Sequence, residues 1–386
     1  MRGYRGVWRR WTDSTVAERK QILPYIDGLR GVAILMVIAY HLAAEVGAQF
    51  AIGPLQTVFG SGHRGVQLFF ILSAFTLFAS SQKRFKTDRL PILSFYIRRI
   101  FRIVPFWLLV NVIWALILLP NWTTVASSAT FAFGFLRFIP GYELVPGGWS
   151  LFVEETFYLF LPLIFGFISS TRRALGLAIL LFVISELWWR FASQIQAFSH
   201  ANFIFFAPPA HWFAFGLGIL LFFVATNERV RTRLLENRVA YYFLDAATLV
   251  AGFFLLSGEY RLATLSLLLV VFASIPSRTM LGRIMRLGLL RRLGRYSYSI
   301  YLLHFLFLIT LLPVRDWLWR VTGAVDGPAE LKLAVYLPVF CAVMLVVGFL
   351  SFNLFEKPFI DMGRRLNAWI NRRRAQPATQ AEMTAL

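Results

Sequence analysis

Two things are scarce in this sequence: charged residues and cysteine. Asp, Glu, Lys and Arg make up only 15% of the 386 residues, whereas a soluble globular domain usually carries about a quarter. The one cysteine, Cys341, lies in an apolar run, which excludes a disulfide framework and a metal site built from several cysteines. Hydrophobic residues make up 58% and the mean hydropathy is +0.64. These values exclude a disordered chain, a coiled coil and an ordinary soluble enzyme, and they predict an all-α, polytopic membrane helix bundle.

Several catalytic motifs are also absent. The sequence has no HExxH and no pair of histidines four residues apart, so we expect no zinc and no other metal. It has no GxSxG elbow, no GxxxxGK[ST] loop and no GxGxxG, which leaves serine-triad hydrolysis and ATP-driven work without support. We find no internal repeat, which weakens the case for a two-fold symmetric transporter.

What the sequence has in abundance is apolar runs of membrane-spanning length. About 20 apolar residues cross a hydrocarbon core, and the connections between several runs are too short to hold a separate domain. We therefore predict one bundle of about ten spans, at residues 25–47, 65–82, 103–120, 149–170, 174–190, 204–226, 239–257, 261–277, 296–318 and 333–355.

The excess of basic residues, a net charge of +20, is distributed between the apolar runs. Six alternate connections, which include both ends of the chain, hold 31 of the 39 Lys and Arg residues, and the other five hold 7. Positive residues collect on the cytoplasmic side of membrane proteins. The count thus fits ten spans with both termini in the cytoplasm, and it favours the bilayer over nucleic acid as the partner of the basic residues.

The first apolar run carries two ionisable residues at membrane depth, Arg30 and His41. Such residues are costly in a spanning helix and usually have a function. Eleven residues of helix return to within about 20° of the same face and rise about 16 Å. Arg30 is therefore expected near the cytoplasmic end, and His41 deep in the bilayer on the same stripe. A purely structural role for the pair is an equally open alternative.

A second candidate lies at the expected start of the third span. Arg99 and Arg102 are three residues apart and share a helix face, and Pro105 follows at the start of the span. Guanidinium groups suit phosphate oxygens. The alternative is an ordinary positive flank of a membrane span.

Two later segments place further polar groups together. Glu154 and Tyr158 are four residues apart in a segment that enters the fourth span behind Gly147-Gly148. Tyr301 and His304 are three residues apart in the ninth span. The alternatives are an interfacial glutamate with aromatic anchoring in the first case and a buried structural histidine in the second.

The remaining histidines give weaker signals. His63 and His200 fall in outer connections and are interpreted as solvated residues. His211 follows Pro208-Pro209, which is expected to break or bend the sixth span, so this side chain could line a cavity.

Six segments, taken in order along residues 25–358, match the motifs of a known protein family. They are Arg30 followed after ten residues by His41, Gly62–Phe75, Arg99-x-x-Arg102 before Pro105, Trp149–Tyr158, Ser297–His304 and Glu356-Lys357-Pro358. Together they resemble the motifs of the acyltransferase-3 family of integral membrane O-acyltransferases. The match favours Glu154 over Glu155. Ala74 stands where the family has a glycine, so the resemblance does not support a close helix approach there.

The resemblance implies an enzyme, an acyl-CoA-dependent O-acyltransferase of the bacterial inner membrane. Such an enzyme moves an acyl group, by family preference acetyl, from cytoplasmic acyl-CoA to a hydroxyl of an extracytoplasmic glycan or lipid-linked saccharide. The expected organisation is a basic cytoplasmic segment at residues 1–24, a transmembrane acyltransferase domain at 25–358, and a basic, then polar, cytoplasmic tail at 359–386.

On this hypothesis the donor is held by basic residues on the cytoplasmic side. Arg99 and Arg102 would bind the CoA phosphates, and Arg30 would help there or line the channel. The pantetheine arm would run along the first span to His41. His41 would then act as general base on the acceptor hydroxyl, or carry the acyl group itself.

The other candidates have less defined roles. Glu154 would orient His41 or bind acceptor hydroxyls, and Tyr158, Tyr301 and His304 would bind the substrate. An alternative function is a glycolipid or polysaccharide transporter or flippase without covalent chemistry, which explains the bundle but not the combination of cytoplasmic arginines with a deep histidine. A membrane scaffold explains neither feature.

Overall fold

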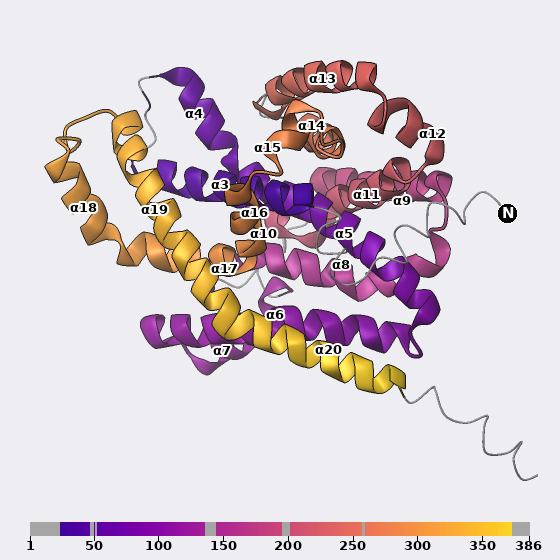
Figure 1. Cartoon of the computed structure of the whole chain (residues 1–386). Coiled ribbons are helices and arrows are strands. Elements are labelled where there is room, and N and C mark those ends of the chain that lie inside the picture. The colour runs from indigo at the N-terminus through magenta and orange to yellow at the C-terminus, as the bar shows by residue number, and fades with distance from the viewer. Residues whose placement is uncertain are drawn as a thin grey trace, which may run out of the picture.

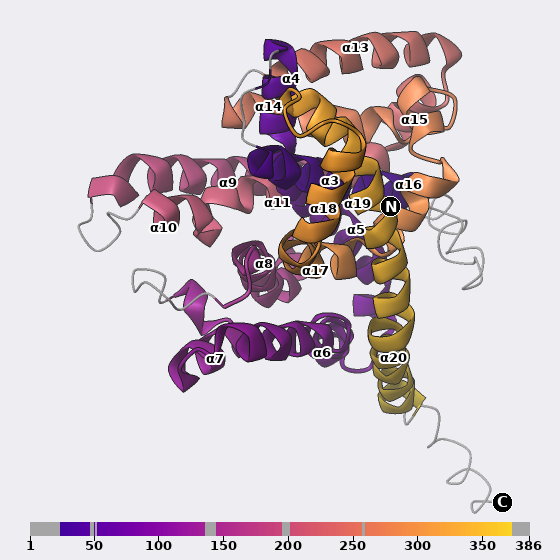
Figure 2. The same cartoon turned by 90° about the vertical axis from the view of Figure 1, so that its left-hand side faces the viewer.

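The computed structural model describes residues 24–46, 50, 52–135, 144–194, 201–256 and 259–372. These ranges contain helices and no strand. The expected segment 1–24 lies outside the described residues except for Pro24, and the last part of the expected tail, 373–386, also lies outside them. The longer helices (Figures 1 and 2) are α3 (Pro24–Glu45), α5 (Gly65–Thr87), α6 (Pro91–Leu118), α8 (Gly148–Phe167), α9 (Thr171–Phe191), α11 (Pro208–Ala225), α13 (Arg238–Leu256), α14 (Tyr260–Ala273), α17 (Ser297–Thr310), α19 (Ala329–Ser351) and α20 (Lys357–Arg372).

Shorter elements join these helices. They are α4 (Gly53–Gly60), the 3-10 turn η1 (Ser61–Arg64), α7 (Trp122–Ala129), the 3-10 turns η2 (Ala132–Gly134) and η3 (Ala192–Gln194), α10 (Ala201–Phe206), α12 (Glu228–Val230), the π-helical turn η5 (Arg231–Leu235), α15 (Met280–Ile284), α16 (Gly288–Arg295), α18 (Leu312–Val321) and the π-helical turn η6 (Phe352–Glu356).

Eight helical runs in the described part of the chain are long and apolar enough to cross a membrane. The bent pair α17–α18 raises this number to nine, and α14 is apolar but only 14 residues long. Each of the ten expected runs coincides with one of these helices. The prediction of an all-α, polytopic membrane bundle is confirmed, whereas the side on which each terminus lies remains a prediction.

The ninth expected span, 296–318, is not one straight helix. The chain bends by 61° between α17 and α18, and Pro313 lies in the first turn of α18, where its missing N–H costs no helical hydrogen bond. None of the residues of α18 is buried, and the helix carries Arg315, Asp316 and Arg320. The span prediction was therefore wrong over its last turns, because apolar content alone does not reveal a bend.

The third and tenth spans are longer than expected. Helix α6 begins at Pro91, so the arginines expected in a connection already lie on the helix. Helix α19 continues through the π-helical turn η6 into α20. There Gly363 packs on Phe101 of α6, and Asn371 accepts a hydrogen bond from the Arg89 N–H. The boundary expected after residue 358 thus falls inside a helical run that packs against α6.

Helices α5 and α11 approach closely at Ala74, the position where the family has a glycine. Ala74 is fully buried, and Gly218 of α11 faces it: a Cβ at Gly218 would lie 2.3 Å from the Ile71 carbonyl oxygen and 2.9 Å from the Ala74 Cβ. The glycine needed for the contact is therefore supplied by the partner helix. A side chain at Gly218 would push the two backbones apart.

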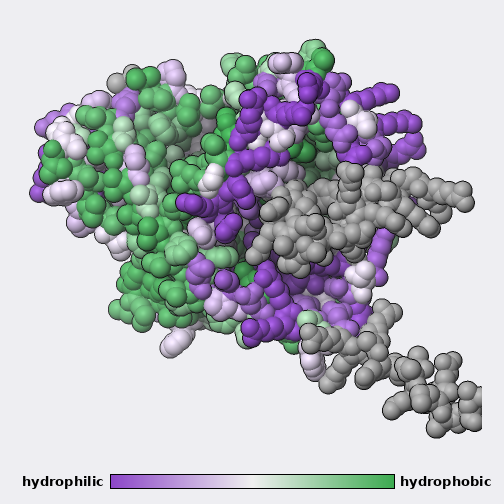
Figure 3. Space-filling model, in the orientation of Figure 1, coloured by the Kyte–Doolittle hydropathy of each residue, from purple (hydrophilic) through white to green (hydrophobic). Residues whose placement is uncertain are grey.

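The surface divides into an apolar and a polar part. Large apolar side chains on α6, α8 and α13 are strongly exposed, including Leu116, Phe167 and Phe253 at 72% each. Figure 3 shows hydrophobic residues over much of the left of the molecule and hydrophilic residues gathered at the right. We call the right-hand end the basic face, where α5 and α8 end and α6 and α9 begin. An exposed apolar surface of this kind fits contact with lipid.

Candidate active site

Two cavities lie inside the bundle, and they share part of one wall. The first has a volume of about 330 Å³ and the second about 610 Å³. Val66 of α5 and Tyr301 of α17 line both. Arg30 lines the first cavity and His41 the second, although both belong to α3. Their separation along this helix, about 16 Å, places the first cavity toward the basic face and the second toward the opposite face.

The first cavity brings together the three predicted arginines, and we call it the arginine cavity. Arg30, on α3, donates a hydrogen bond to the Thr76 hydroxyl at 3.2 Å. Arg99 and Arg102 lie on α6, and the Arg99 guanidinium stacks over the ring of Tyr158 at 5.6 Å. In the described structure, no carboxylate lies within salt-bridge distance of any of the three arginines. The cavity therefore offers guanidinium groups to an anion.

Glu154 also faces this cavity, and its hydrogen bonds connect α5 to α8. The Ser73 hydroxyl and the Tyr158 hydroxyl both donate to Oε1 of Glu154, and the two hydroxyls also contact each other. Ser73 thus points across to α8, whereas Thr76 and Ser80 on the same helix donate to backbone carbonyls of α5. The cluster gives a membrane-depth carboxylate two hydrogen-bond donors, which offset much of the cost of its burial.

The second cavity contains histidines and aromatic rings, and we call it the histidine cavity. His41, His63 and His211 line it together with Gln67, and the described lining residues include no Asp or Glu. His211 contacts the Phe205 carbonyl through Nε2 at 2.6 Å and the Tyr260 hydroxyl through Nδ1 at 3.1 Å, so both of its ring nitrogens have protein partners. The aromatic lining residues are Tyr40, Trp149, Phe205, Phe206, Tyr301 and Phe305.

The hydrogen bond of His41 determines which of its nitrogens is basic. Nδ1 lies 2.9 Å from the Val37 carbonyl oxygen, and a carbonyl only accepts, so Nδ1 carries the proton. Nε2 then holds the free lone pair. The ring is half-buried, lines the cavity and packs edge-on against Phe305 at 4.5 Å between centroids. An imidazole held in this tautomer is equipped to take a proton from a group in the cavity.

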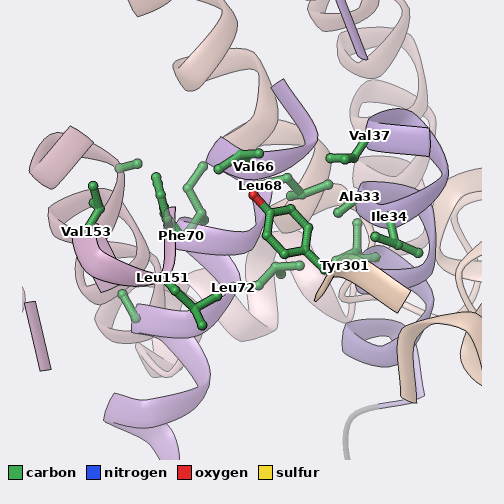
Figure 4. Packing of buried hydrophobic residues seen from close by; sticks show 14 of the residues in the cluster. Ala33, Ile34, Val37, Val66, Leu68, Phe70, Leu72, Leu151, Val153 and Tyr301 are labelled. Carbon is green, nitrogen blue, oxygen red and sulfur yellow. The ribbon is translucent and has the colours of Figure 1, made fainter. Parts of the chain in front are cut away.

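Tyr301 forms the shared wall between the cavities. Its hydroxyl lies 2.7 Å from the Ser150 hydroxyl and donates to the Gly147 carbonyl at 3.1 Å. Gly147 has φ +78°, a conformation that favours glycine, and this turn carries the carbonyl to the tyrosine. Figure 4 shows the ring among apolar side chains of α3 and α5. The two cavities are therefore separated by a hydrogen-bonded side chain rather than by a whole helix.

The structure brings most predicted site residues together, but in two groups. Arg30, Arg99, Arg102, Glu154 and Tyr158 line the arginine cavity. In the other group, His41 lines the histidine cavity, Tyr301 lines both, and His304 lies behind Tyr301 and next to His41 without lining either.

Glu154 makes no hydrogen bond with His41 in the described structure, so the expectation that it orients the imidazole has no support in the contacts. His63 is half-buried and lines the histidine cavity, rather than being simply solvated as expected. His211 does line a cavity, as the proline pair suggested, and His200 lies outside the described residues.

Sequence reasoning missed Ser73 and the pair formed by Ser150 and Tyr301. Ser73 lies seven residues after Val66, which puts the two on one helix face, and this spacing was the available signal. The contact of Ser150 with Tyr301 joins residues 151 positions apart, and no local pattern reveals such a pair. Across the residues that the structure describes, no group of three or more His, Cys, Asp or Glu could hold a metal ion.

A family model described as an acyltransferase domain matches residues 23–352, which is most of the chain. The chain belongs to the acyltransferase-3 family. The six motif segments lie within this match apart from the last, Glu356-Lys357-Pro358, which follows it. The arginines and the histidine that line the two cavities lie inside the matched acyltransferase domain.

Named relatives of this family member come from Staphylococcus aureus. O-acetyltransferase OatA of strain MRSA252 is 21% identical over 389 residues, which cover 92% of this chain and 60% of that protein. OatA of strain NCTC 8325 is 22% identical over 318 residues, which cover 73% of this chain and 50% of that protein. A protein of strain COL, named as an inferred O-acetyltransferase, is 24% identical over 405 residues, with 92% and 60% covered.

The chain spans at most 60% of the length of these curated relatives. No solved structure matches it.

Proposed function

We propose that this protein is a membrane O-acetyltransferase that uses acetyl-CoA on the cytoplasmic side and acetylates a hydroxyl of an extracytoplasmic glycan or lipid-linked saccharide. The observation that carries the proposal is the pair of cavities: a guanidinium-lined cavity toward the basic face and a cavity with an available imidazole base toward the other face. The names of the relatives support acetyl as the group that is moved.

The donor fits the arginine cavity. CoA has several phosphate groups on one end and a long, thin pantetheine arm on the other. Arg99, Arg102 and Arg30 provide guanidinium forks for phosphate oxygens near the basic face. Arg102 is exposed, which suits contact with a ligand that enters from the cytoplasm. The arm would extend past Tyr301 toward His41.

The acceptor fits the histidine cavity. Its lining of aromatic rings suits the apolar faces of sugar rings, and Gln67 and His63 offer hydrogen-bond partners for hydroxyl groups. In the described part of the chain, the residues that line this cavity include no carboxylate to attract a cationic acceptor. We therefore assign a neutral or anionic saccharide to this cavity.

The chemistry needs one proton carrier. His41 Nε2 takes the proton of the acceptor hydroxyl as its oxygen attacks the thioester carbonyl carbon. The carbon–sulfur bond breaks, the acetyl group becomes an oxygen ester, and the CoA thiolate takes the proton from His41. The reaction balances without a metal, an oxidant or ATP. In the alternative route, His41 Nε2 attacks the thioester carbonyl carbon and the CoA thiolate leaves. The acceptor hydroxyl then attacks the acetyl group on the imidazole, the carbon–nitrogen bond breaks, and the hydroxyl proton passes to the thiolate.

The decisive experiment incubates membranes that contain the protein with acetyl-CoA labelled in the acetyl group. We expect label in the glycan fraction as an alkali-labile ester, and none with membranes that lack the protein. Movement of a glycan or glycolipid across the membrane without covalent label would favour the transporter and overturn the proposal.

A further inference from the structure

A second imidazole lies against His41. The ring of His304, on α17, is 5.0 Å from that of His41 between centroids, and the two planes are tilted by 45°. Phe305 packs on both rings, at 4.5 Å from His41 and 4.3 Å from His304. His304 is completely buried and lines neither cavity. It therefore does not face the substrate, and any role that it has in the reaction acts through His41.

The tautomer of His304 is fixed in the same way as that of His41. Its Nδ1 lies 2.5 Å from the carbonyl oxygen of Tyr301, so Nδ1 donates and Nε2 holds the lone pair. This Nε2 is buried and, in the described part of the chain, has no hydrogen-bond partner. Buried polar atoms are rarely left without a partner, so this one needs an explanation.

Among the aromatic rings that the described structure places against His304, one can change its charge during the reaction. The ring contacts of His304 are His41, Phe305 and Tyr301. Phe305 has no polar hydrogen, and the Tyr301 hydroxyl is engaged by Ser150 and Gly147. When His41 accepts a proton at Nε2, its ring becomes positively charged, and the centre of this ring lies 5.0 Å from that of His304. The buried lone pair of His304 thus gains a cation beside it at the step at which the reaction needs stabilisation.

We propose that His304 is the positioning residue of His41, and that its Nε2 lone pair stabilises the imidazolium that forms when His41 takes the acceptor proton. A carboxylate has this role in the serine–histidine–aspartate triad. Here the carboxylate that the sequence suggested for this role, Glu154, belongs to the other cavity and is bonded to Ser73 and Tyr158. The inference rests on the proposed function, because it assigns His41 as the base.

The test compares three variants in which different parts of the side chain are kept. His304→Ala removes both nitrogens. His304→Asn keeps a donor near Nδ1 for the Tyr301 carbonyl, and His304→Gln places an acceptor oxygen near Nε2. Each is expressed in membranes, and transfer of labelled acetyl from acetyl-CoA to the glycan fraction gives kcat and the KM for acetyl-CoA.

We expect kcat to fall about 10- to 100-fold in H304A and H304N. This is the size of effect expected when a polar contact with a charged group is lost. We expect H304Q to recover to within about fivefold of the unchanged protein, and KM for acetyl-CoA to stay within about threefold in all three. Full activity of H304N, or an effect on KM alone, would show that the ring serves only structure and would overturn the inference.

Asn111→Ala is the matched control. Asn111 is buried on α6, donates to the Trp107 carbonyl on its own helix at 2.9 Å, and leaves Oδ1 without a partner. It lines neither cavity, so kcat should not change.

If H304A does not accumulate in membranes, the comparison of kcat between H304N and H304Q still tests the role of His304, because both variants keep a large polar side chain. Absence of transfer by the unchanged protein would overturn the proposed function instead, whereas normal transfer by H304A and H304N would refute only the role of His304.

Discussion

The arginine cavity and the histidine cavity share Tyr301 and Val66 but differ in almost everything else. One gathers three guanidinium groups around a single cluster that contains a carboxylate. The other is lined by imidazoles and aromatic rings, with no carboxylate among the lining residues that the structure describes. On the proposed function, this difference places anion binding and proton transfer in opposite halves of one bundle. The proposed base would thereby be kept away from the electric field of the arginines, where its protonated form is disfavoured.

The largest effect is expected at the base of the histidine cavity. His41→Ala should lower acetyl transfer by at least about 10³-fold, because it removes the proposed general base from that cavity. Binding of CoA should change little, because the arginines lie in the other cavity. The measurement is labelled acetyl in the glycan fraction beside CoA affinity on the same membranes. Near-normal transfer in this variant would exclude His41 as the base.

The next effect belongs to the arginine cavity and should have the opposite profile. Changing Arg99 and Arg102 together to Ala should weaken CoA binding about 10- to 100-fold, since two charge-assisted contacts with phosphate are lost. The measurement is the Kd for CoA. The pair Arg172 and Arg173, exposed at the start of α9 on the same face, is the control. An equal loss of affinity in both double variants would point to general surface charge rather than to the cavity.

A smaller effect decides to which cavity Glu154 contributes. Glu154→Gln removes one negative charge from a cavity with three guanidinium groups, so CoA, an anion, should bind about 3- to 10-fold more tightly. The Kd for CoA is again the measurement. If Glu154 instead served His41, kcat would fall while the affinity for CoA stayed the same, and the division between the cavities would have to be redrawn.

The smallest effect concerns the wall between the cavities. Tyr301→Phe removes the hydroxyl that holds the ring to Ser150 and Gly147. A lost neutral hydrogen bond is worth a few-fold in such an equilibrium, so we expect about a threefold rise in acetyl-CoA hydrolysis without acceptor, measured as released CoA thiol. Tyr336→Phe is the control, because the hydroxyl of this buried residue has no partner among the described residues and lines neither cavity. An equal rise in both variants would contradict the role of Tyr301.

Much of the fold could be predicted because its signals are local. Each apolar run coincides with a helix, since a span needs only enough consecutive apolar residues. The bend between α17 and α18 and the helical start of α6 at Pro91 were missed. Both depend on where a helix begins or turns, which depends on packing and on backbone contacts more than on average hydropathy.

The candidate site could be predicted residue by residue, but its arrangement could not. The spacing of Arg30 and His41, and of Arg99 and Arg102, places each pair on one helix face. The pairing of Glu154 with Ser73, and of His41 with His304, joins side chains on different helices. Spacing along one helix carries no information about such partners, so the sequence could not show that Glu154 bonds Ser73 and Tyr158.

The sequence by itself determined that this chain is a helical membrane protein with arginines near one end of the bundle and a histidine deep inside it, because hydropathy and helical periodicity are properties of consecutive residues. Only the tertiary structure decided that these groups line two cavities rather than one, that Tyr301 separates them, and that the neighbour of His41 is a second imidazole. Those facts arise from how helices distant in sequence pack together, and contacts between helices are set by the fit of whole surfaces.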